Sequence, residues 1–147
     1  MSIELSQEEA DILFNMKKLY TGKELPVQFP GCGGKKSLNF QSENGREFFT
    51  LTIFKGSVDM YKVSMTHIGR KTIVLARLDL NQTHRNPDGE CIRGNHLHIY
   101  RADYGDKFAV PIPPFFENCK KTLDFLDKFM DYCHIIKKPE IQEDLFS

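Results

Sequence analysis

The amino-terminal segment carries apolar residues at helical spacing. Ser6 and Glu9 match the capping box that opens many helices. The positions behind it recur three or four residues apart, as one apolar face of a helix requires: Ile12, Leu13, Met16, Leu19 and Tyr20. We therefore expect a helix from about Gln7 to Leu19.

From Ser37 onward the pattern changes to alternation, with β-branched and aromatic residues in short runs. The runs are "SLNFQS", "REFFTLTIF", "VDMYKVSMTHI" and "KTIVLARLDL", separated by turn signals that contain Gly45, Gly56 and Gly69. A further strand is expected from Asn95 to Arg101. Short links between strands favour antiparallel neighbours, so we expect a curled antiparallel sheet of about five strands.

The carboxyl-terminal part returns to helical spacing in "ENCKKTLDFLDKFMDYCHI". Its apolar stripe comprises Cys119, Leu123, Leu126, Phe129, Met130 and Cys133. Pro139 ends this helix, and residues 136–147 are expected to form an extended tail. The fold class is therefore α+β, a single domain over residues 1–147, with an N-terminal and a C-terminal helix packed on the sheet.

Composition adds few constraints on function. Twenty basic and twenty acidic residues give a formal net charge of zero, so no overall field draws the chain to nucleic acid or to an anionic membrane. No signal peptide or apolar span stands out, and a cytoplasmic protein without membrane contact is expected. The four cysteines form no C-x-x-C pair and are expected to be free thiols.

Candidate chemistry gathers in the stretch "HRNPDGECIRGNHLHIY", residues 84–100, which holds three of the five histidines. Alternation places His96, His98 and Tyr100 on one face of the predicted strand. The preceding strand "LARLDL" carries Arg77 and Asp79 on its polar face. If the two strands pair as a long hairpin, these polar rows lie side by side.

The connecting loop turns at Asn86-Pro87-Asp88-Gly89, where proline presets φ and glycine accepts a positive φ. Such a turn could hold His84 and Arg85 over the same face. The resulting candidates for catalysis are His84, His96, His98 and Tyr100, and those for ligand binding are Arg77, Asp79, Arg85, Asn86, Asp88 and Arg101. Arg101 fits least well, because alternation directs it to the opposite face. His67 and His134 lie apart from this set and are expected at the surface or at a helix end.

Several chemistries are open for this constellation. A divalent metal could bind His84, His96 and His98, although the sequence does not require one. Paired histidines could instead cleave RNA without a metal, one as base and one as acid. The groups could also only bind RNA, a nucleotide or another phosphate ligand, or form a polar network that stabilises the hairpin.

The segment from Leu75 to Pro113, with "FMDYCHIIKKPEIQ" after it, resembles an uncharacterised family of small bacterial and phage proteins. The shared features are an Arg-Leu-Asp strand, a His-x-Asn-Pro-Asp-Gly turn, a His-x-His-x-Tyr-Arg strand and a Trp-Ala-like step, here Phe108-Ala109. The resemblance implies a bacterial or mobile-element origin and no particular reaction.

Two functions remain open at this stage. One is a toxin-like ribonuclease or RNA binder acting through the histidine stretch. The other is a non-catalytic protein that binds a host complex, such as a phage-encoded inhibitor of host defence, through the first helix or the tail. Neither fixes the oligomeric state.

Overall fold

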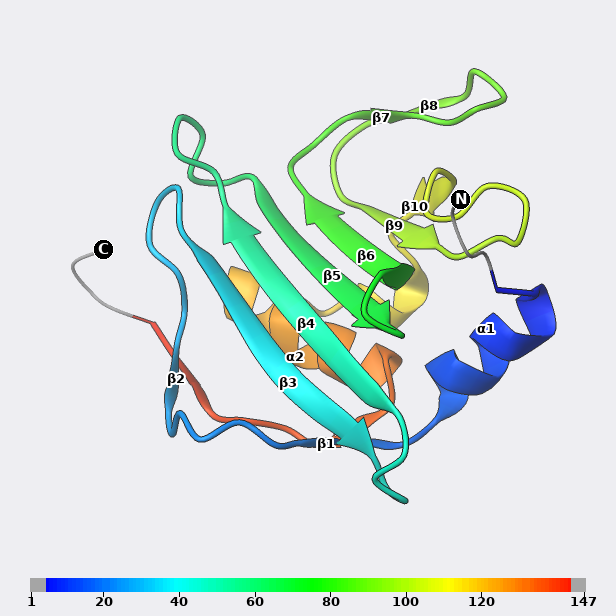
Figure 1. Ribbon diagram of the computed structural model, residues 1–147. Coiled ribbons are helices and arrows are strands. Elements are labelled where there is room, and N and C mark those ends of the chain that lie inside the picture. Colours follow the sequence, from blue (N-terminus) through cyan, green and yellow to red (C-terminus); the bar gives the residue numbers. More distant parts are fainter. Residues whose placement is uncertain (1–4, 144–147) are drawn as a thin grey trace.

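The protein is described over residues 5–143 of a computed structural model, and it is an α+β fold built on one large sheet (Figure 1). The sheet has eight strands in the order β10-β9-β6-β5-β4-β3-β1-β11, all antiparallel neighbours except β1 and β11, which run parallel. In chain order its strands are β1 (Lys18–Tyr20), β3 (Lys35–Ser42), β4 (Phe48–Lys55), β5 (Val63–Gly69), β6 (Ile73–Leu80), β9 (His96–Ile99), β10 (Ala109–Pro111) and β11 (Ile135–Lys137).

Two short strand pairs complete the β structure. Strand β2 (Val27–Gln28) pairs in parallel with β12 (Ile141–Gln142). Strands β7 (His84–Arg85) and β8 (Cys91–Ile92) form a small hairpin, which lies beyond the ends of β6 and β9 (Figure 1). This hairpin brings His84 to the main sheet.

One face of the sheet is covered by helix α2 (Thr122–Tyr132), which crosses behind it (Figure 1). The helix buries Phe125, Leu126, Phe129 and Met130. They belong to one apolar core with the inward residues of the strands, among them Leu38, Phe40, Leu51, Ile53, Met65, Leu78 and Leu97. Because side chains alternate along each strand, the polar residues of the same strands point to the opposite face.

That opposite face is not covered by a helix over β3, β4 and β5 (Figure 1). Helix α1 (Gln7–Asn15) lies beside the sheet, near the end of β9, where the amide of Gln7 donates to the carbonyl of Tyr100. Within residues 5–143, no helix is long and apolar enough to cross a bilayer.

The structure confirms the α+β class and the two helices but corrects several details. The main sheet has eight strands where about five were expected, because short segments at both edges, β1, β10 and β11, also pair. The N-terminal helix ends at Asn15, not at Leu19. Lys18 and Tyr20 are instead buried in β1, so the apolar residues that continued the helical pattern serve a strand.

The C-terminal region differs in a similar way. Helix α2 begins at Thr122, and the carboxylate of Asp124 accepts hydrogen bonds from the backbone N–H groups of Lys120 and Lys121. Cys119 therefore precedes the helix. The tail is held by the pairing of β11 with β1 and of β12 with β2. All four cysteines are free thiols. The predicted tail residues 144–147 lie outside the described part of the chain.

Candidate functional site

Strands β6 and β9 pair antiparallel, with Asp79 opposite His96 and Arg77 opposite His98. This is the pairing expected from the polar rows. The neighbouring side chains point to the face that α2 does not cover, so two imidazoles, one carboxylate and one guanidinium share a small area of the sheet.

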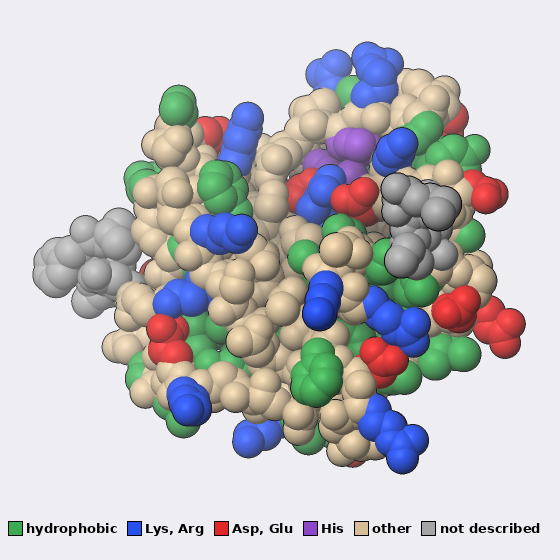
Figure 2. All heavy atoms as spheres, viewed as in Figure 1, with side chains coloured by type: hydrophobic (Ala, Val, Ile, Leu, Met, Phe, Trp, Pro, Cys, Tyr) green, Lys and Arg blue, Asp and Glu red, His purple; other side chains and the backbone are tan. Residues whose placement is uncertain are grey.

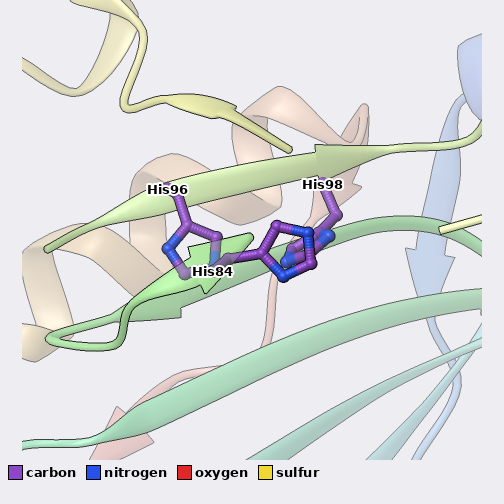
Figure 3. A group of neighbouring side chains, drawn as sticks. All are labelled: His84, His96 and His98. Carbon is purple, nitrogen blue, oxygen red and sulfur yellow. The ribbon is translucent and has the colours of Figure 1, made fainter. Parts of the chain in front are cut away.

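The hairpin adds the third imidazole (Figure 3). The ring centroid of His84 lies 5.6 Å from that of His96 and 4.5 Å from that of His98, and the latter two are 5.0 Å apart. One ligand nitrogen of each ring lies within 4.8 Å of the ligand nitrogens of the other two. His96 and His98 are buried and His84 is half-buried, so His84 is the histidine nearest to solvent.

Asp79 is the centre of a buried network. Its Oδ2 lies 3.1 Å from His96 Nε2, 3.2 Å from His98 Nε2 and 3.2 Å from Arg77 Nε. Arg77 also donates to Asp106 Oδ2 at 2.8 Å. Burial raises the pKa of the Asp79 carboxyl group, but the hydrogen bonds with both histidines and the charge of Arg77 outweigh burial and hold that pKa well below its ordinary range.

Each of the three imidazoles has one ring nitrogen at a backbone carbonyl. His84 Nε2 lies 2.8 Å from the Lys107 carbonyl oxygen, His96 Nδ1 lies 3.0 Å from that of Gly94, and His98 Nδ1 lies 2.7 Å from that of Asp106. A carbonyl can only accept a hydrogen bond, so each of these nitrogens carries the hydrogen. In the neutral imidazole the other nitrogen then presents a lone pair.

The lone pairs of His96 Nε2 and His98 Nε2 therefore face an oxygen that is itself an acceptor. Such a contact is favourable only with a cation between or beside the two atoms, either a proton or a metal ion. At His98 the guanidinium of Arg77 partly supplies it, because Nη2 donates to Nε2 at 3.0 Å. At His96 burial lowers the pKa, but the hydrogen bond with Asp79 more than compensates, and the pKa is raised above its ordinary value.

A polar atom of the same network is left without a partner. Asp79 Oδ1 is buried and accepts no hydrogen bond from the described residues. Buried carboxylate oxygens are nearly always hydrogen-bonded or bound to a metal ion. The network thus leaves one buried carboxylate oxygen, Asp79 Oδ1, available for a positive ion.

The other candidate residues from the sequence either lie apart from the three histidines or form hydrogen bonds with nearby backbone groups. The hydroxyl of Tyr100 donates to the Leu5 carbonyl, because β9 ends at Ile99 and alternation no longer applies. Arg101 is exposed and stacks on Phe108. Arg85 donates to the Gly89 carbonyl, and Asp88 accepts from the Glu90 N–H within the turn.

Asn86 has a clear positional role. Its side chain is buried, donates to the Ala109 carbonyl at 2.9 Å and accepts from the Ala109 N–H at 2.8 Å. It therefore attaches the β7–β8 hairpin to the edge strand β10 as a short strand would. The structure places Arg77, Asp79, His84, His96 and His98 together, and it adds Asp106, which the sequence pattern did not indicate.

His67 is not at the surface, as had been expected, but fully buried in the core face of β5. Neither of its ring nitrogens has a hydrogen-bond partner among the described residues. His134 follows α2 directly and is exposed, in agreement with a helix-end position.

Comparison with known proteins gives one match. The chain belongs to a family of unknown function, DUF6978, which it matches over residues 5–135. No curated protein and no solved structure matches it. The matched range contains the whole histidine site.

Proposed function

We propose that the protein binds one divalent transition-metal ion through His84, His96 and His98, and that this ion acts on a phosphodiester. One observation carries the proposal. Three imidazoles converge with one candidate ligand nitrogen each within 4.8 Å, and each ring also has one nitrogen at a backbone carbonyl. This second contact is typical of histidines that bind metals in proteins.

The donor set indicates the class of metal. Imidazole nitrogens favour zinc and the neighbouring divalent ions of the first transition series over magnesium and calcium, which favour oxygen. A tetrahedral zinc ion holds its nitrogen ligands about 3.3 Å apart, so the three rings have to draw together by about 1–2 Å. His84 stands on a two-residue strand of a small hairpin and is the ligand with most freedom to move.

The rest of the network suits hydrolysis. Three protein ligands leave a position for water, whose pKa a bound zinc ion lowers to about 7. A zinc ion held by His84, His96 and His98 would supply a hydroxide to attack phosphorus; the ester P–O bond would break and the leaving oxygen would take a proton from water. Asp79 offsets part of the positive charge of the metal, and Arg77 stands beside it to stabilise charge that develops on the phosphate.

The metal-free alternative is less well supported by the geometry. An acid–base pair must reach the substrate from two sides, whereas His96 and His98 are buried and share one carboxylate oxygen. The partner-binding alternative stays a prediction. It relies on helix α1 or the tail, where Ile12 and Ile136 are exposed, although the tail is paired into sheets as far as Gln142.

The test is metal binding followed by hydrolysis of a generic phosphodiester. The purified protein is stripped with chelator and titrated with Co²⁺, whose visible absorption reports tetrahedral nitrogen coordination, and then with competing Zn²⁺. We expect one equivalent per chain and hydrolysis of bis(p-nitrophenyl) phosphate by the loaded protein. His98→Ala should weaken binding by more than about tenfold, whereas His134→Ala, the matched control, should leave it unchanged.

Three results would contradict the proposal. They are the absence of stoichiometric metal, binding that His98→Ala and His134→Ala affect equally, and a loaded protein that hydrolyses the ester no faster than free metal ion. The last result alone would leave a metal-binding protein without this reaction.

A further inference from the structure

The open face of the sheet leads directly to the histidine site. The strand register aligns five outward residues across five neighbouring strands, in the row Ser37, Thr52, Thr66, Arg77 and His98. A second row runs beside it: Lys35, Phe54, Ser64, Asp79 and His96. Outward residues on β3–β5 are exposed or half-buried, so a ligand can lie across them.

This face carries few charges, and its cation Arg77 is paired with Asp79 and Asp106. The outward side chains of β3, β4, β5, β6 and β9 include a single carboxylate, that of Asp79. It is buried and lies against Arg77 and both histidines. Lys35 and Arg77 are the cations. Figure 2 shows this face as a hollow of mostly uncharged surface that rises to histidine, basic and acidic side chains at its upper right.

Two aromatic side chains on this face are available for stacking. Phe54 is 47% exposed and lies in the row that ends at His96. Phe48 is 65% exposed and lines a cleft of about 150 Å³ with Asn39, Thr50 and Ile68. Exposed aromatic rings on a sheet face form good platforms on which nucleobases stack.

We infer that this face binds an extended single-stranded RNA, with one base stacked on Phe54 and the chain directed toward the histidine site. Phe54 and His96 are three strands apart, about 14 Å at ordinary strand spacing. A flexible single strand can therefore place a base on Phe54 and a phosphodiester near His96 at the same time. The hydroxyls of Ser64 and Thr66, which lie between them, can donate to phosphate and ribose oxygens.

A duplex does not fit this arrangement, because its bases are stacked on one another and cannot reach an aromatic side chain. The inference deepens the proposed function by naming its substrate class. Only cleavage depends on the metal. Binding to the sheet face does not need the ion, so the two can fail separately.

The experiment measures fluorescence anisotropy of short labelled oligoadenosine and oligouridine, in chelator, against the intact protein. Phe54→Ala should weaken binding by about five- to a hundredfold, and Phe54→Trp should preserve it, because the ring supplies the stacking. Thr66→Glu places a negative charge in the middle of the row and should weaken binding by at least about tenfold. Thr66→Gln is its uncharged control and should bind normally.

The inference is overturned if the oligonucleotides do not bind, if a duplex of the same length binds as tightly, or if the Phe54 and Thr66 variants bind like the parent protein. Folding of each variant is checked by its thermal midpoint. RNA binding in a protein that takes up no metal would support this inference and contradict the metal centre. Metal-dependent ester hydrolysis without RNA binding would do the reverse.

Discussion

At the scale of single residues, the histidines have two different environments. His84, His96 and His98 are surrounded by carbonyls, a carboxylate and a guanidinium, whereas His67 is enclosed by the core. The His67 ring stacks on Phe49 with centroids 5.6 Å apart. Burial, and next the charge of Lys18, lower the pKa of His67 from about 6.5 to about 3.

His67 should make the protein sensitive to acid. In the unfolded chain this imidazole gains a proton as pH falls below about 6.5, but in the folded protein it does so only near pH 3. The unfolded state therefore binds more protons between these two pH values. The free energy of unfolding consequently decreases as the pH is lowered. Between pH 7 and pH 4.5 the free energy of unfolding should therefore decrease by about 2–3 kcal/mol less in His67→Leu than in the parent protein.

Urea unfolding of both proteins at the two pH values measures this difference. His134→Leu is the comparison: burial and the charge of Lys18 also lower the pKa of His134, but less than that of His67, so this variant should change the pH dependence less. Equal losses of stability in the parent protein and in His67→Leu would show that His67 is protonated in the folded state.

The sequence of β5 contains a signal for the inward position of His67. His67 follows Val63 and Met65 at every second residue, and these two are buried on the core face. Alternation alone therefore placed the imidazole inward. The polarity of an imidazole does not outweigh the register of a strand whose other residues are already fixed.

At the scale of elements, the β7–β8 hairpin decides whether the third histidine joins the site. The hairpin has only two residues in each strand, and its turn contains Gly89 with a φ of 94°. So small an element is not stable alone. Its position comes from the pair of hydrogen bonds that Asn86 makes with Ala109 of β10.

Asn86→Ala should therefore loosen the hairpin and displace His84. We expect Co²⁺ affinity to fall by about 10- to 100-fold, as for other residues that orient metal ligands. Loss of two buried hydrogen bonds should also cost about 1–3 kcal/mol of stability. Metal titration and urea unfolding measure the two effects, with the exposed Asn118→Ala as control. Unchanged metal affinity would exclude His84 as a ligand, or Asn86 as the residue that positions it.

Elements at the ends of the chain show where local pattern fails. Lys18 lies in β1 and is fully buried, donating from Nζ to the carbonyls of Phe14 and Cys133. Burial lowers the pKa of Lys18 to about 8. One of its two carbonyl partners, that of Cys133, is distant in sequence, so helical spacing up to Tyr20 could not reveal this setting.

At the scale of the whole molecule, a metal ion at this site would join β6, β9 and the β7–β8 hairpin. A ligand that binds only the folded state stabilises it by about 2.7 kcal/mol at a hundred times its dissociation constant. For a chain of this size we therefore expect Zn²⁺ to raise the thermal midpoint by about 5–10 °C.

Thermal unfolding with Zn²⁺ and with chelator measures this shift, and His96→Ala should abolish it. An equal shift in His96→Ala would mean that Zn²⁺ binds elsewhere on the chain.

The sequence by itself determined the class of fold and several residues of the candidate site. Alternation in "LARLDL" and "NHLHIY" is a local property. It put Arg77 and Asp79 on the polar side of one strand and His96 and His98 on the polar side of a second strand, and the two strands pair. The Asn-Pro-Asp-Gly turn is equally local. The amphipathic stripe of α2 follows from spacing alone.

Only the tertiary structure decided which candidates meet. Tyr100 and Arg101 leave the site because β9 ends at Ile99, and Asp106 joins it because the chain folds back beside Arg77. The edge strands β1, β10 and β11 form because partners far along the chain satisfy their backbone hydrogen bonds. Such contacts depend on the packing of the whole chain, and no window of sequence contains them.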